Sequence, residues 1–127
     1  MTVLLDTSVL IDHLRGDIRA TQLLQRRVLA GDRLCASTVV RTEILAGLRR
    51  GEEEATHRLL DALAWLDVTV EVADIAGEMA HRYHKSHSGV DLADYLVAAT
   101  ARALNAELLT QNVKHFPMFV GLRPAYT

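Results

Sequence analysis

The sequence predicts an α/β fold in which a short parallel β-sheet is flanked by helices on both faces. Short apolar runs, such as residues 2–5 and 107–110, have the length and composition of buried strands. Longer segments with apolar residues at helical spacing separate these runs. Strands that alternate with helices favour right-handed crossovers, which give a parallel sheet covered on both faces. No linker, repeat or low-complexity tract interrupts the 127 residues, so we expect one domain over residues 1–127.

The N-terminal part is expected to contain one strand and two helices. Residues 2–5 form the strand, because they are a short apolar run. Residues 9–14 form a brief helix that ends near Gly16. Residues 18–30 form a longer helix, because their apolar side chains recur at helical spacing up to the stop signal Gly31-Asp32.

The middle of the chain is expected to alternate in the same way. Residues 34–36 form the second strand. Ser37 or Thr38 then caps a helix that runs to about Arg50, because a hydroxyl satisfies free N–H groups of the first turn. Residues 52–65 form a helix with leucines on one side.

After residue 66 we expect two strands, two helices and one edge strand. Residues 67–72 alternate and are rich in β-branched side chains, which indicates a third strand. The remaining expected elements are a helix over 73–87 ended by Ser88-Gly89, a helix over 91–104 closed by Asn105, a strand over 107–110 and an edge strand near Leu122.

Composition narrows the class of protein. The formal net charge is -2, so the overall charge does not indicate nucleic-acid binding, and a polyanion would need a local basic patch and a bound metal. Cys35 is the only cysteine and cannot form an internal disulfide, which favours a reducing cytoplasm. We find no secretory signal pattern and no apolar run of the ~18 residues that a membrane span needs. We therefore expect a cytoplasmic protein without membrane contact.

Acidic residues recur where elements of this fold begin or end. Asp6 follows the first strand, Asp91 and Asp94 open a helix, and Asn112 lies just past the last strand. In parallel sheets functional groups gather beyond the carboxyl ends of the strands, so these positions are consistent with one site. Asp91 and Asp94 are also explained by helix capping alone, and Asp6 could cap the helix that follows it. Glu43 is harder to explain, because it is expected to border the core.

Carboxylates that converge repel one another, and a divalent cation is the simplest partner for them. Hard oxygen ligands without a His/Cys set indicate Mg²⁺, with Mn²⁺ as a possible substitute, rather than zinc. Such a cation could activate water and stabilise charge on a phosphate during in-line attack. We expect Asp6 and Asp94 to bind this metal and Glu43 to complete its shell.

Four segments, in this order and spacing, resemble the PIN-domain ribonucleases, and most closely the VapC toxins of bacterial toxin–antitoxin pairs. The resemblance spans nearly the whole chain, and its segments are Leu4 to Ile11, Thr42 to Gly47, Asp94 to Ala101 and Leu109 to Phe116. It implies a Mg²⁺-dependent endoribonuclease that cuts structured RNA such as tRNA or rRNA. It also implies a homodimer that is silenced by a small VapB-like antitoxin whose tail covers the acidic site.

The resemblance assigns roles to individual positions. Asp6, Glu43 and Asp94 match the three recurrent acidic residues, and Asp91 is an added ligand or water holder. Supporting roles fall to Thr7, Ser8, Thr110 and Asn112, with Thr7 or Ser8 steadying a metal-bound water. Many relatives carry Asp at the positions of Asn112 and His115, so the resemblance leaves open whether one or two metals bind.

Other interpretations remain open at this point. Arg82 and Lys85 belong to a basic stretch that either contacts RNA phosphate beside the acidic site or is a solvated helix end. A PIN-like module that only binds a partner would explain Asn112 and His115. A phosphatase with Asp6 as nucleophile would usually need a second acid where Ser8 stands and a well-placed lysine, and neither is evident.

Overall fold

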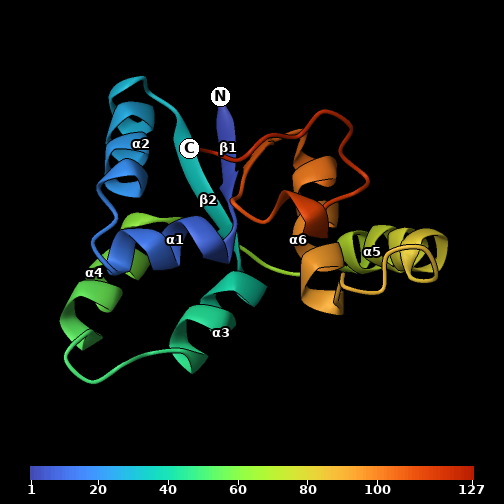
Figure 1. Cartoon of the computed structure of the whole chain (residues 1–127), viewed down its shortest axis with the longest axis horizontal. Coiled ribbons are helices and arrows are strands. Elements are labelled where there is room, and N and C mark those ends of the chain that lie inside the picture. Colours follow the sequence, from blue (N-terminus) through green and yellow to red (C-terminus); the bar gives the residue numbers. More distant parts are fainter.

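A computed structural model describes residues 1–127 and contains one parallel sheet with helices on both faces (Figure 1). The four strands lie in the order β3-β2-β1-β4. The elements are β1 Thr2–Leu5, α1 Thr7–Leu14, α2 Ile18–Leu29, β2 Arg33–Ser37, α3 Thr38–Ala46, α4 Glu53–Ala62, β3 Ala64–Leu66, α5 Val70–Tyr83, α6 Leu92–Leu104, β4 Glu107–Leu109 and the 3₁₀ turn η1 Val113–His115.

The strand order explains the two helical layers. The chain steps from β1 to β2 and on to β3 in one direction, and then crosses back to place β4 on the other side of β1. Crossover connections between parallel strands are right-handed, so reversing the direction of travel along the sheet places the later helices on the opposite face. In Figure 1, α2 and α4 lie on one side of the strands, and α5 and α6 lie on the other. The predicted α/β class with helices on both faces is confirmed.

The core is centred on β1. Val3, Leu4 and Leu5 are fully buried, because β1 has a strand on each side and helices above and below. Leu4 lies between Cys35 of β2 and Leu108 of β4 in the sheet register. Cys35 is buried and free, as expected of a small apolar core residue.

One predicted strand is wrong. Residues 67–72 do not form a strand, and the third strand is instead Ala64–Leu66, whose first two residues are expected from the sequence to end the helix over 52–65. The Thr69 hydroxyl accepts a hydrogen bond from Val72 N–H, so Thr69 caps α5 and the β-branched Val70 and Val72 lie in its first turn. Ala64–Leu66 is a strand because it pairs with β2, where Ala36 is opposite Trp65.

Several predicted boundaries also shift. The helix expected to reach about Arg50 ends at Ala46, and the one expected to reach residue 87 ends at Tyr83. The edge strand expected near Leu122 is absent. The helix expected over 91–104 is confirmed, since Asp91 caps it and Asn105 ends it in the left-handed region at φ 51°. None of the helices is long and apolar enough to cross a membrane.

Candidate active site

Asp6 lies at the carboxyl end of β1 and is 4% exposed. Its Oδ2 accepts hydrogen bonds from Thr110 Oγ1 at 2.7 Å and from Ser8 Oγ at 3.0 Å. Although Asp6 occupies the N-cap position of α1, its side chain accepts no capping hydrogen bond. The capping explanation of Asp6 is therefore excluded. The two hydroxyls fix the carboxylate through Oδ2, and no hydrogen bond of the protein ends on Oδ1.

Glu43 reaches the same region from α3. The Thr7 hydroxyl, at the start of α1, donates a hydrogen bond of 2.8 Å to Glu43 Oε1. The expectation that Glu43 borders the core is wrong, because its side chain is exposed and Val40 and Ile44 carry the buried face of α3. Glu43 is therefore held by a polar contact at the surface and not by burial.

Asp91 and Asp94 form a capping box at the start of α6. Asp91 Oδ1 accepts from Asp94 N–H at 3.0 Å, and Asp94 Oδ2 accepts from Asp91 N–H at 3.1 Å. Capping is thus a real role of this pair. Each carboxylate has one further oxygen that these hydrogen bonds do not use.

Asp94 is the most perturbed of these acids. The pKa of Asp94 is raised to about 6, chiefly by burial and also by the nearby charge of Asp91, while the Asp91 N–H and the His115 charge act in the opposite direction. His115 Nδ1 lies 3.4 Å from Asp94 Oδ2. A nearby positive charge stabilises the ionised form of a carboxyl that is placed among other carboxyls.

These side chains surround one pocket of about 350 Å³. The structure brings together Asp6, Glu43, Asp91 and Asp94 with the predicted supporting residues Thr7, Ser8 and Asn112. The buried residue Thr110 lies behind Asp6 and acts on it by hydrogen bonding. Only one of the eleven lining residues, Ile11, is hydrophobic. The pocket is therefore built to receive a polar or charged group.

Two polar lining residues, Asp12 and Gln111, were not assigned a role from the sequence. Asp12 lies on α1, four residues after Ser8, a spacing that places both on one face and could have indicated it. Gln111 follows Thr110 directly. In contrast, Arg82 and Lys85 do not line the pocket, because Arg82 lies on α5 beside Arg102 and Lys85 is exposed beyond the end of that helix.

The donor set of this pocket fits a hard divalent cation, since five carboxylates line it and no cysteine does. The spacing is open: no group of three or more Asp, Glu, His or Cys side chains stands close enough to enclose an ion.

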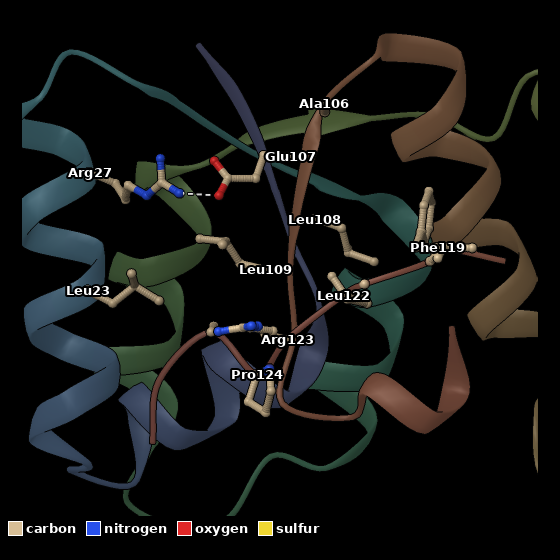
Figure 2. Close-up of a pocket in the computed structure, with 13 residues that line it drawn as sticks. Leu23, Arg27, Ala106, Glu107, Leu108, Leu109, Phe119, Leu122, Arg123 and Pro124 are labelled. Atoms are coloured by element: carbon tan, nitrogen blue, oxygen red, sulfur yellow. Dashed lines mark hydrogen bonds and ion pairs between the residues drawn. The ribbon is translucent and has the colours of Figure 1, made fainter. Parts of the chain in front are cut away.

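A second cavity, of about 440 Å³, lies at the outer edge of β4 (Figure 2). It is bounded by α2, β4 and residues 119–125, and most of its lining is apolar. Arg27 and Glu107 form an ion pair at its margin, and Arg123 also lines it. This cavity contains no cluster of carboxylates, so the smaller acidic pocket is the candidate active site.

Comparisons with known proteins agree on one family. The family model described as PIN domain matches residues 3–117. Ribonuclease VapC19 of Mycobacterium tuberculosis is 47% identical over 123 residues, which cover 97% of this chain and 98% of the relative. Ribonuclease VapC10 of the same organism is 40% identical over 124 residues, covering 98% and 92%. A toxin-antitoxin complex from Klebsiella pneumoniae has a chain with a TM-score of 0.81 and 25% identity, covering 98% of both chains. The chain therefore belongs to the PIN domain family, and within it to the VapC group.

Proposed function

We propose that this chain is an endoribonuclease, the toxin of a type II toxin–antitoxin pair, with the acidic pocket as its active site. The relatives called ribonuclease match along nearly the whole chain, which supports RNA as the substrate class. The observation that carries the proposal is the orientation of Asp6. Ser8 and Thr110 hold one of its oxygens and leave the other for a ligand in a pocket lined by four further carboxylates.

The reaction we propose is Mg²⁺-dependent hydrolysis of a phosphodiester bond, with Mn²⁺ as an effective substitute. When bound, the cation would supply an activated water and would stabilise charge on the phosphate. Asp6, Asp94 and Glu43 are the residues that would hold it, with Asp91 as an additional ligand or water holder. Thr7 positions Glu43 by its hydrogen bond, and Ser8 and Thr110 position Asp6.

The number of cations depends on the side of the pocket formed by Asn112 and His115. Asn112 offers an amide oxygen without charge, and His115 places a ring nitrogen 3.4 Å from Asp94 Oδ2. Both features reduce the negative charge available to a second cation. We therefore propose one tightly held cation.

The substrate we propose is structured RNA such as tRNA or rRNA. A net charge of -2 gives the chain no general attraction for a polyanion, so contacts must come from local basic side chains. Arg82 and Lys85 are candidates that would act outside the pocket, on RNA that extends beyond it.

The partner we propose is a VapB-like antitoxin whose tail covers the acidic pocket, in a cytoplasmic assembly in which the toxin is a homodimer. The Klebsiella pneumoniae structure with the same fold is a toxin-antitoxin complex. An apolar groove of about 430 Å³ between α1, α2 and α4 is the candidate surface for an apolar antitoxin segment. Val28 and Leu29 on its rim are 59% and 86% exposed, so a partner that covers them would be stabilised by burial of apolar area.

A PIN-like module that binds its partner without cleaving RNA is the second candidate, and the open spacing of the carboxylates favours it. The phosphatase alternative lacks support, because Ser8 stands where a second acid is needed and no lysine lines the pocket.

The deciding experiment is to incubate the purified chain with total RNA, with and without Mg²⁺, and to map the new RNA ends by sequencing. We expect cuts at discrete positions that appear with Mg²⁺ and disappear with a chelator. RNA that stays intact with Mg²⁺ and with Mn²⁺ would favour the binding module, and cleavage that persists in chelator would contradict the metal dependence.

A further inference from the structure

Tyr126 connects the far end of the chain to the wall of the acidic pocket. It is 9% exposed, and its backbone N–H and C=O both bond the side-chain amide of Gln111, at 3.1 Å and 3.0 Å. Its hydroxyl donates to Asp12 Oδ2. The Arg19 guanidinium lies over its ring, 5.2 Å from the centroid. Gln111 and Asp12 both line the pocket, so Tyr126 contacts the pocket wall at two places without lining it.

The residues that Tyr126 contacts are joined directly to those that hold Asp6. Gln111 N–H donates to Ser8 Oγ at 3.0 Å, and Ser8 Oγ donates to Asp6 Oδ2. Next to Tyr126, Ala125 N–H donates to the carbonyl of Thr110 at 3.0 Å. Residues 125–126 therefore hold residues 110–111, from which Thr110 donates to Asp6 directly and Gln111 bonds Ser8 on α1, the second donor to Asp6.

Residues 110–112 are held by individual hydrogen bonds and not by regular secondary structure. They lie between the end of β4 at Leu109 and the short turn η1, and belong to no helix or strand. Regular backbone pairing does not fix their position, so side-chain contacts must do so. A displacement of the order of 1 Å in a reacting group can cost about 100-fold in rate, so a small movement here would matter.

The contact with Asp12 has its own consequence for the pocket. The Tyr126 hydroxyl donates a hydrogen bond to Asp12 Oδ2, so that oxygen already has a partner within the protein. Burial, followed by the hydrogen bond to Asp12, raises the pKa of Tyr126, so the phenol remains protonated and remains a donor. This hydrogen bond directs one oxygen of Asp12 toward Tyr126.

We propose that Tyr126 is a positioning residue of the acidic pocket, acting through Gln111 on Asp6 and through its hydroxyl on Asp12. The expected effect of Tyr126 on RNA cleavage rests on the proposed function. Its expected effect on the geometry of residues 110–112 does not depend on that function.

The first test needs no catalysis. Gln111→Met keeps side-chain length and removes both hydrogen bonds to Tyr126, and Tyr126→Phe removes only the hydroxyl. Amide hydrogen exchange at residues 111 and 112, followed by NMR, should become about tenfold faster in Gln111→Met. The ¹³C shift of the Asp6 carboxyl should move in Gln111→Met, and that of the Asp12 carboxyl in Tyr126→Phe.

Two variants serve as matched controls. Gln22 is exposed on α2 and makes no side-chain hydrogen bond, so Gln22→Met changes the same side chain without a contact. Tyr83→Phe removes a phenol oxygen that bonds no residue of the protein. Neither control should alter exchange at residues 111 and 112. Unchanged exchange and unchanged carboxyl shifts in Gln111→Met and Tyr126→Phe would overturn the proposal.

The second test uses cleavage of the RNA identified above. We expect kcat to fall by about 10-fold in both variants while KM stays within about twofold, because positioning affects the reacting groups more than RNA binding. A lowered melting temperature with unchanged kcat would show that Tyr126 only stabilises the fold, and would contradict the proposal. If the wild-type chain cleaves no RNA, the proposed function fails, and the exchange and shift measurements still decide whether Tyr126 positions Asp6.

Discussion

Thr7 and Glu43 are joined by a hydrogen bond of 2.8 Å from the Thr7 hydroxyl to Glu43 Oε1, which links α1 to α3 across the acidic pocket. It is the only hydrogen bond that the Glu43 carboxylate receives from the protein. Because Glu43 is exposed, this single contact decides whether its carboxylate is aimed at the pocket or moves freely in solvent.

Thr7→Val keeps the shape of residue 7 and removes this donor. We expect the free energy of unfolding to change by less than about 1 kcal/mol, because the contact is exposed. RNA cleavage should fall by about 10-fold, because Glu43 is no longer held. Urea unfolding and initial cleavage rates measure the two effects. Thr42→Val, beside Glu43 on α3, is the control, and equal cleavage losses in both variants would argue against a specific role of the contact.

Asp6→Asn should abolish detectable cleavage and leave the fold intact. The amide oxygen can still accept from Ser8 and Thr110, so the NH₂ group takes the place of the free carboxylate oxygen facing the pocket. An NH₂ group cannot ligate a cation. Circular dichroism should match the wild type. Asp61→Asn on the exposed side of α4 controls for the loss of one charge. Wild-type cleavage by Asp6→Asn would remove Asp6 from the proposed site.

Asp94 should make the metal-free protein more stable in acid. Burial, with a further contribution from the Asp91 charge, raises the pKa of Asp94 from 3.8 to about 6, so the folded chain binds this proton more tightly than the unfolded chain. The resulting stabilisation is fully present below pH 3.8, the pKa of an unperturbed Asp, and is lost as pH rises through about 6. Urea unfolding at stepped pH in chelator should show this component in the wild type and not in Asp94→Asn.

The Asp91 charge is one cause of that shift, and it can be tested separately. Asp91→Asn should lower the pKa of Asp94 without restoring its ordinary value, because the larger cause, burial, remains. The ¹³C shift of the Asp94 carboxyl, followed by NMR against pH, gives the midpoint directly. A midpoint that does not move would show that Asp91 acts only through its capping hydrogen bonds.

Asn112→Asp should strengthen cation binding. The Asn112 side chain lines the pocket and makes no hydrogen bond within the protein, so an added carboxylate would face the same space. We expect Mn²⁺ affinity to rise by about 10-fold, or a second site to become measurable, in a calorimetric titration. Gln22→Glu on exposed α2 adds the same unit of charge far from the pocket and should have little effect. Equal gains in both variants would indicate that only net charge matters.

Much of the site could be predicted because its signals are local. Asp91 and Asp94 are three residues apart, and that spacing alone predicts both the capping box and their shared face. The end of β1 and the left-handed Asn105 are equally local features. The third strand could not be predicted in the same way. Ala64–Leu66 has only three residues, and its pairing with β2 decides its conformation.

The parts of the site that were missed depend on distant residues. Glu43 was expected at the core because apolar residues flank it, but the rotation of α3 against the sheet turns Ile44 inward and Glu43 outward. The contact between Asp12 and Tyr126, which are 114 positions apart, is a further example. No window of sequence contains both residues, so only the folded chain shows the contact.

The hydrogen bond from Thr110 to Asp6 spans 104 positions and has a consequence for synthesis of the protein. Chains are made from the N-terminus, and Asp6 leaves the ribosome among the first residues. Its carboxylate gains its second donor only when Thr110 has followed and β4 has paired with β1. A nascent or truncated chain that ends before residue 110 therefore lacks one of the two donors that hold Asp6. The pocket proposed as the active site is therefore completed only when nearly all of the chain has been made.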